Sequence, residues 1–220
     1  MKRVTLGKMQ NPIRGFLHGA AAAAAVVGLF VLLNRARESG PAITGTLIFG
    51  GALLIMYTVS ALYHSIPWGD QWKDRLQRVD HSMIFLVVAG TFTPIAIAAL
   101  DGAWLVVALS VIWAIALTGI LLKALLPNVK TWLSLTLQMV MGWSLLVWIP
   151  AINTELGTAA VVLIGIGGLC YSVGVIIFTT KRPRLFPRSF SYHELFHVLV
   201  ITGSTLHFLV IFWYAIPLTA

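Results

Sequence analysis

Two histidines one helical turn apart lie near the end of the chain, in the segment HELFH that runs from His193 to His197. A spacing of four residues puts both imidazoles on one face of an α-helix, so the pair can bind one metal ion. Ser60 and His64 have the same spacing earlier in the chain, and His64 could supply a third nitrogen from a neighbouring helix. Three protein ligands with an open fourth position are typical of catalytic zinc. We therefore predict that His64, His193 and His197 bind Zn²⁺.

Asp80, in the segment RVDHS, adds a carboxylate to this set. It could orient or deprotonate a metal-bound water, which the ion makes more acidic. Ser60 could donate a hydrogen bond to the oxyanion that forms when such a water attacks a carbonyl group. Zinc is favoured over magnesium or calcium because the candidate ligands are imidazoles rather than oxygens. The predicted chemistry is metal-assisted hydrolysis, with Asp80 and Ser60 as the catalytic residues.

The remaining histidines are interpreted as packing or hydrogen-bonding residues. His207 lies ten residues beyond His197, about 15 Å further along a helix, which is too far to share its ion. His18 and His81 lie near the ends of predicted helices, where single histidines usually form hydrogen bonds within the protein. Cys170 is the single cysteine, so neither an intrachain disulfide nor a cysteine-based metal site can form.

These residues must be positioned inside a membrane. Of 220 residues, 59% are hydrophobic and 10% are charged, and the mean hydropathy is +0.91. A soluble domain carries about 25% charged residues, and a disordered chain combines low hydrophobicity with high charge, so both classes are excluded. A transmembrane barrel is excluded because the period-two alternation of its strands is absent. The sequence predicts an all-α polytopic membrane protein.

Seven segments without Asp, Glu, Lys or Arg are long enough to cross a bilayer, which takes about 20 helical residues. We predict a single domain over residues 1–220 with helices at about 15–34, 42–64, 80–100, 102–122, 131–150, 157–180 and 193–215. The first segment resembles a signal peptide, since basic residues precede Ala20–Ala25, but its length and the six segments that follow favour a retained helix.

The basic residues are distributed asymmetrically, which predicts the orientation. Thirteen of the 15 Lys and Arg residues lie on the N-terminal side of the predicted membrane, and the other side holds only Arg35 and Arg37. The positive-inside rule then places the N-terminus in the cytoplasm and the C-terminus outside. The net charge of +8 is thus interpreted as topology and contact with anionic lipids. Nucleic-acid binding is not expected, because no basic face carries interleaved exposed aromatic residues.

The motifs resemble those of the hemolysin III family, within the progestin and adipoQ receptor superfamily. The resemblance covers roughly residues 14–212. It rests on the following motifs, listed in chain order: Ser60-x-x-x-His64, Asp80, Gly90-Thr-Phe-Thr-Pro94, Met141-Gly-Trp143, Tyr171-Ser-Val-Gly174, His193-x-x-x-His197 and Gly203-Ser-Thr-Leu-His207. Many members carry an acidic pair before the first-helix His-Gly, and residues 11–19 of this chain have none.

The resemblance implies a seven-helix fold with the N-terminus inside, which agrees with the charge distribution. It also implies zinc held by His64, His193 and His197, with Asp80 contacting a zinc-bound water and Ser60 lining the same site. The superfamily is grouped with membrane hydrolases of the alkaline ceramidase type. Bacterial members are linked to membrane lipid homeostasis, and the family name reflects haemolytic activity.

Three functions compete at this stage. The first is zinc-dependent hydrolysis of a lipid amide or ester in the cytoplasmic membrane, with membrane lipids as environment and substrate. The second is a membrane sensor, receptor or cytolytic protein in which zinc only braces the helices and Asp80 is the fourth ligand. The third is a metalloprotease, because HELFH matches the zincin motif, whose Glu activates water. No acid follows His197 to serve as a third ligand, so we interpret Glu194 as a coincidental interfacial acid.

Overall fold

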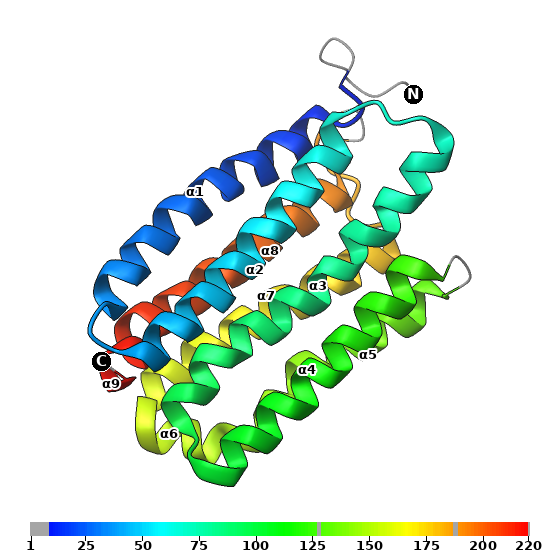
Figure 1. Cartoon of the computed structure of the whole chain (residues 1–220). Helices are drawn as coiled ribbons and strands as arrows, with labels where there is room; N and C mark the ends of the chain where they lie inside the picture. The colour runs from blue at the N-terminus through cyan, green and yellow to red at the C-terminus, as the bar shows by residue number, and fades with distance from the viewer. Residues whose placement is uncertain (1–8, 127–128, 187–188, 220) are drawn as a thin grey trace.

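The computed structural model describes residues 9–126, 129–186 and 189–219. Seven helical segments in this part of the chain are long and apolar enough to cross a membrane (Figure 1). They are α1 (Pro12–Ala36), α2 (Gly40–Ser65), α3 (Asp70–Ala99), α4 (Gly102–Leu125), α5 with α6 (Thr131–Leu156), α7 (Thr158–Thr180) and α8 with α9 (Tyr192–Thr219). The predicted all-α, seven-helix membrane protein is confirmed. Its orientation in the membrane stays a prediction from the charge distribution.

Helix α3 is longer than the sequence suggested. It begins at Asp70, ten residues before the predicted start at residue 80. Its first turns are charged, so hydropathy alone does not reveal them as helix. These turns extend beyond the neighbouring helices in Figure 1 and are largely exposed. The last membrane segment also differs from a simple helix, since a π-helical turn over Ile211–Ala215 separates α8 from α9.

The fifth membrane segment is interrupted rather than continuous over residues 131–150. Helix α5 ends at Trp143, a 3₁₀ turn covers Ser144–Trp148, and α6 (Ile149–Leu156) follows. Pro150 explains the interruption, because proline has no N–H to donate to the carbonyl four residues earlier. In place of an α-helical hydrogen bond, the Ile149 N–H donates to the Leu146 carbonyl oxygen three residues earlier, as in a 3₁₀ helix.

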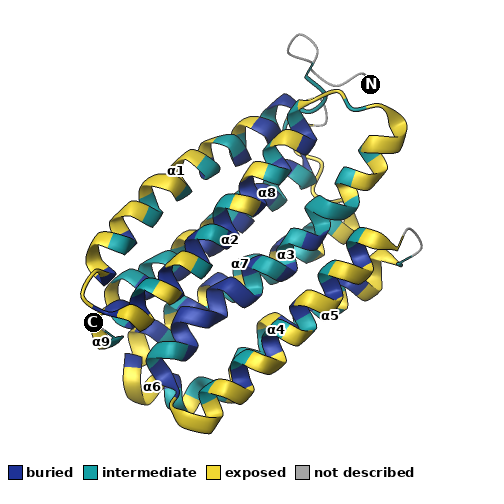
Figure 2. Cartoon of the chain, in the orientation of Figure 1, coloured by how far each residue is buried: buried dark blue, intermediate teal, exposed yellow. Residues whose placement is uncertain are grey.

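Helix α3 forms the centre of the bundle. In its most apolar stretch 67% of the residues are buried, compared with 11% in that of α1, and Figure 2 shows the same contrast along the two helices. Phe85 and Ile95 of α3 and Phe49 of α2 are among the most deeply buried side chains of the core. The outward faces of α1, α4 and α7 carry large exposed apolar side chains, which a soluble protein would bury and which lipid tails can cover.

Small residues allow two helix pairs to approach closely. A Cβ on Gly90 would lie 2.6 Å from the Ala52 Cβ, so α2 and α3 need a glycine at this contact. A Cβ on Gly203 would lie 3.0 Å from the Gly167 carbonyl oxygen, which brings α8 against α7 in the same way. Close backbone approach through small residues is a usual means of packing helices in membranes.

Three chain segments meet at the end of the bundle where α1 begins, here called the amino-terminal end. The C-terminus lies at the opposite end (Figure 1). The Gln10 and Asn11 N–H groups donate to the Ser65 and His64 carbonyl oxygens, at 3.4 and 2.9 Å. The start of α1 therefore caps the end of α2, and the start of α8 lies beside them.

Candidate metal centre

Local signals place the histidines at the helix ends. Proline disfavours a helical conformation in the residue before it, and Ile66, which precedes Pro67, is extended, so α2 ends at Ser65 directly after His64. Ser191 starts α8 as an N-cap in a capping box. His193 thus lies in the first turn of α8 and His197 in the second.

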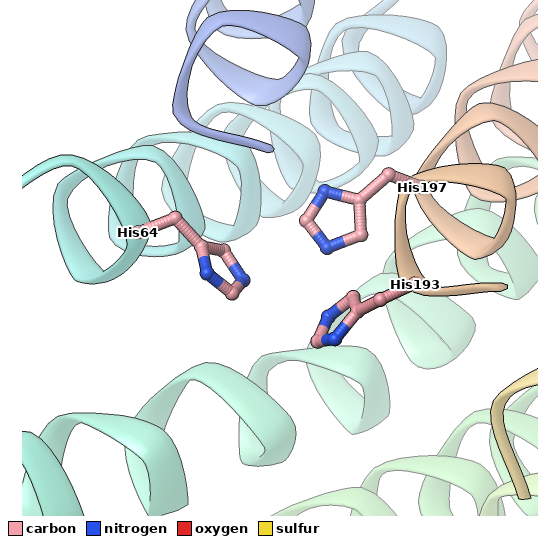
Figure 3. A group of neighbouring side chains, drawn as sticks. All are labelled: His64, His193 and His197. Atoms are coloured by element: carbon pink, nitrogen blue, oxygen red, sulfur yellow. The ribbon is translucent and has the colours of Figure 1, made fainter. Parts of the chain in front are cut away.

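The structure brings His64, His193 and His197 together between α2 and α8, with the rings facing one another (Figure 3). One nitrogen from each ring lies within 4.8 Å of the other two, and the ring centroids are 4.9 to 5.2 Å apart. His64 and His197 are buried and His193 is half-buried. This three-histidine group could hold a metal ion, although His64 and His193 lie 129 positions apart in the chain.

Asp80 and Ser60 lie beside the group without joining it. Ser60 is buried one turn before His64, and its hydroxyl lies against the Asp80 carboxyl group in position to donate a hydrogen bond. Asp80 is not part of the set of ligand atoms that lie within 4.8 Å of one another. Both residues line a cavity of about 40 Å³ together with His193 and His197. That volume can hold water, which needs about 10–15 Å³.

His18 belongs to the same site, although its spacing did not suggest this. Its ring stacks on that of His197 at 3.8 Å between centroids, with an angle of 19° between the planes, and Tyr57 packs on it edge-on at 5.2 Å. His18 is buried, and within the described part of the chain neither of its ring nitrogens has a hydrogen-bond partner. The sequence offered one indication that His18 belongs to the site: it lies near the same end of the predicted bundle as the three predicted ligands.

Glu194 is not a coincidental interfacial acid, and that interpretation was wrong. Its Oε1 accepts a hydrogen bond from the Arg14 Nε at 2.7 Å, and its Oε2 accepts one from the Ser191 N–H at 2.9 Å. The two side chains are 8% and 4% exposed. Glu194 therefore caps α8 and joins it to α1 by a buried ion pair, and both of its oxygens are occupied. This geometry argues against the water-activating role that a zincin assigns to it.

The other two histidines occupy different places. His207 lines a second cavity, and its Nε2 lies 3.3 Å from the Ile164 carbonyl oxygen, which confirms the predicted hydrogen-bonding role. His81 packs edge-on against Phe178 at 5.8 Å, and its carbonyl oxygen accepts a hydrogen bond from the Gln138 side chain. Packing is thus confirmed for His81, but it also lines the 40 Å³ cavity.

The second cavity has a volume of about 150 Å³ and extends from the site toward the opposite end of the bundle. Aliphatic and aromatic side chains make up most of its wall. Five residues line both cavities: Met56, Ile84, Gln138, Phe196 and Val200. The polar site and an apolar space are therefore direct neighbours.

Fold and site together define a polytopic membrane protein with a buried three-histidine centre. Comparison with known proteins identifies its family: the family model described as Haemolysin-III related matches residues 7–208, so the chain belongs to that family, within the progestin and adipoQ receptor superfamily. This confirms the resemblance drawn from the motifs.

Two relatives are similar over nearly their whole length. The chain is 31% identical to the hemolysin-3 homolog of Bacillus subtilis (strain 168) over 201 residues, which cover 90% of this chain and 91% of the relative. It is 29% identical to hemolysin-3 of Bacillus cereus over 219 residues, which cover 99% and 97%.

Proposed function

We propose that this chain is a zinc-dependent hydrolase of the cytoplasmic membrane that cleaves an amide or ester bond of a lipid and serves membrane lipid homeostasis. The observation that carries the proposal is the position of Asp80. It shares a cavity with His193 and His197 but stays outside the group of three ligand nitrogens. Such an arrangement leaves a place for water and substrate beside the three histidines, whereas a structural zinc normally has four protein ligands.

The three histidines suit zinc in both geometry and chemistry. Zinc–nitrogen bonds are about 2.0–2.1 Å long, so nitrogens on one tetrahedral ion are about 3.4 Å apart. The nitrogens of His64, His193 and His197 lie within 4.8 Å of one another, and small side-chain rotations can close that difference. Imidazole ligands favour zinc over magnesium or calcium, which prefer oxygen. When bound, the ion would polarise the scissile carbonyl group and make a nearby water more acidic.

The chain's own residues would then divide the remaining work. The Asp80 carboxylate would accept the proton of the attacking water and return it to the leaving nitrogen or oxygen. While the Ser60 hydroxyl donates to Asp80, it holds that carboxylate in place. Turned toward the substrate, the same hydroxyl would donate to the carbonyl oxygen as negative charge develops there. The apolar cavity next to the site would take a hydrocarbon chain of the lipid.

The substitution Asp80→Asn tests this proposal, because it keeps the shape of the side chain and removes the base. Fatty acid released from detergent micelles that contain short-chain ceramide or short-chain phosphatidylglycerol would be measured by mass spectrometry, alongside zinc per chain. We expect full zinc content and hydrolysis reduced by about 100-fold or more, the usual contribution of a general base. Asp74→Asn is the matched control, since Asp74 is an exposed aspartate of the same helix.

Two results would contradict the proposal. Loss of zinc in Asp80→Asn would make Asp80 a fourth ligand and favour a sensor braced by metal. Release of fatty acid by wild-type protein and Asp80→Asn at equal rates would remove Asp80 from the chemistry.

A second candidate function, membrane lysis, has the support of the relatives' names, since one is called hemolysin-3 and the other its homolog. Dye release from liposomes would test it separately. Lysis that persists in the double variant His193→Ala/His197→Ala, while fatty acid release is lost, would show that lysis does not need the proposed metal.

A further inference from the structure

We infer that Lys123, with Arg78 nearby and the His81 ring as a hydrogen-bonding group, binds the phosphate of a lipid headgroup in the same cavity, beside the three histidines. This inference rests on the proposed function, because it names the class of lipid that the hydrolase would accept. The 40 Å³ cavity is lined by two kinds of polar residue. One set contains the candidate ligands and catalytic groups, with His18, and the other consists of His81, Lys123, Thr131, Ser134 and Gln138.

Lys123 is the central observation. It lies in the last turn of α4 and is only 6% exposed. Its Nζ makes a single described hydrogen bond, a long one of 3.4 Å to the Val129 carbonyl oxygen, although an ammonium group has three protons to donate. A buried charge without a counter-charge is costly. Among the residues that the structure describes, no carboxylate lies within ion-pair distance of Lys123.

Arg78 of α3 adds a second positive charge near Lys123, and the His81 ring offers a hydrogen-bonding nitrogen from the same helix. Arg78 and His81 lie three residues apart, so they share a face of that helix, and Lys123 lies within electrostatic range of both. The Arg78 Nε is buried and has no hydrogen-bond partner among the described residues. Two cations whose donors are incompletely satisfied thus lie close to each other, where they repel. A bound anion would relieve that repulsion.

Helix α5 supplies neutral hydrogen-bonding groups to the same cavity. Thr131, Ser134 and Gln138 follow one another at spacings of three and four residues, which places them on one face of the helix. Ser134 and Gln138 are buried, and the Gln138 amide donates to the His81 carbonyl oxygen at 3.0 Å. Hydroxyl groups beside lysine and arginine are the usual partners of a phosphate.

Ordinary membrane topology does not account for this arrangement. A lysine that only marks the cytoplasmic side extends its ammonium group to water or to lipid headgroups at the surface, as exposed Lys130 can. Lys123 instead lines the interior cavity that contains the candidate catalytic groups. The neighbouring 150 Å³ apolar cavity would hold a chain of the same molecule, so the expected ligand is a phosphate-bearing lipid rather than free phosphate.

The experiment measures binding without turnover. Zinc-loaded full-length protein in a neutral detergent is titrated with ether-linked dioctyl phosphatidylglycerol, which has no ester to cleave, and with 1,2-dioctylglycerol ether, which lacks the phosphate. We expect tighter binding of the first lipid. We also expect Lys123→Met to weaken binding of the phosphate-bearing lipid by about tenfold or more, as for loss of a hydrogen bond to a charged group. Binding of the phosphate-free lipid should be unchanged.

Matched variants distinguish binding at this site from general attraction of the lipid to a basic surface. Lys123→Arg keeps the charge and should bind the phosphate-bearing lipid as wild type does, and Arg78→Gln should weaken that binding in the same way as Lys123→Met. Lys130→Met removes an exposed charge near the same end of the bundle and should change the affinity less than twofold. His193→Ala should still bind this lipid, so failure of the hydrolase proposal and failure of the phosphate site give different results.

Three outcomes would overturn the inference. The first is wild-type affinity in both Lys123→Met and Arg78→Gln. The second is an equal loss in Lys130→Met, which would indicate surface attraction alone. The third is displacement of the lipid by inorganic phosphate at comparable concentration, which would assign the cations to a free anion and refute the headgroup.

Discussion

The substitution Glu194→Gln tests whether the second residue of the HELFH motif acts in chemistry or in assembly. Glutamine can still accept the hydrogen bond from the Ser191 N–H, so the cap of α8 is kept. What is lost is the negative charge beside Arg14, in a pair whose side chains are 8% and 4% exposed. Removing one partner of a buried pair costs about 3–5 kcal/mol. For a chain of this size each kcal/mol shifts Tm by about 2–4 °C, so we expect a decrease of about 6–20 °C.

Thermal unfolding of zinc-loaded protein in detergent would measure this shift. The matched control is Glu38→Gln, because Glu38 pairs with Arg37 at 3.5 Å while both side chains are 70% or more exposed, and exposed pairs contribute only about 0–1 kcal/mol. The double variant Arg14→Met/Glu194→Gln removes both charges and should recover most of the lost stability. Below its Tm, Glu194→Gln should retain hydrolysis per zinc-loaded molecule. A Tm equal to that of Glu38→Gln would refute the structural role, and a stable but inactive variant would support the metalloprotease.

Two further predictions concern the metal and the topology. Purified protein should contain about one zinc per chain, and His193→Ala/His197→Ala should lose it and melt at a lower temperature, since bound metal stabilises the folded state. His207→Ala, which removes a histidine outside the group, should retain zinc, and full retention in the double variant would disprove the assignment. A reporter that is active only in the cytoplasm should be silent when fused to the C-terminus and active at the N-terminus, and the opposite pattern would reverse the predicted orientation.

The sequence predicted the seven membrane helices because length and hydropathy determine them with little help from tertiary structure. It also predicted that His64, His193 and His197 could meet, since the spacing of four residues fixes a helix face and the charge pattern fixes the membrane depth. The interruption at Ser144–Trp148 was missed, because the segment is uniformly apolar and only Pro150 signals a break.

The charged residues show most clearly what the sequence could not predict. Arg14 and Lys123 were interpreted as markers of the cytoplasmic side, and both are buried in the structure. Whether a basic residue at a helix end reaches the surface or turns inward depends on which helices pack beside it. Arg14 turns inward because α1 lies next to the start of α8, where the Glu194 carboxylate accepts its hydrogen bond. His18 meets His197 for the same reason. These contacts join residues about 180 positions apart, and local patterns do not contain them.

The site as proposed divides its tasks among separate helices, and this division makes its parts separable by substitution. Metal ligands come from α2 and α8, the proposed base from α3, and the ion pair that holds α8 in place from α1. The cations inferred to bind phosphate come from α3 and α4. Substitution of His197 should therefore mainly lower the metal content, and substitution of Asp80 should lower turnover. Substitution of Glu194 should lower stability, and substitution of Lys123 should weaken lipid binding. If the metal only braced the bundle, all four changes would act through stability, and their effects on turnover would follow the fraction of folded protein.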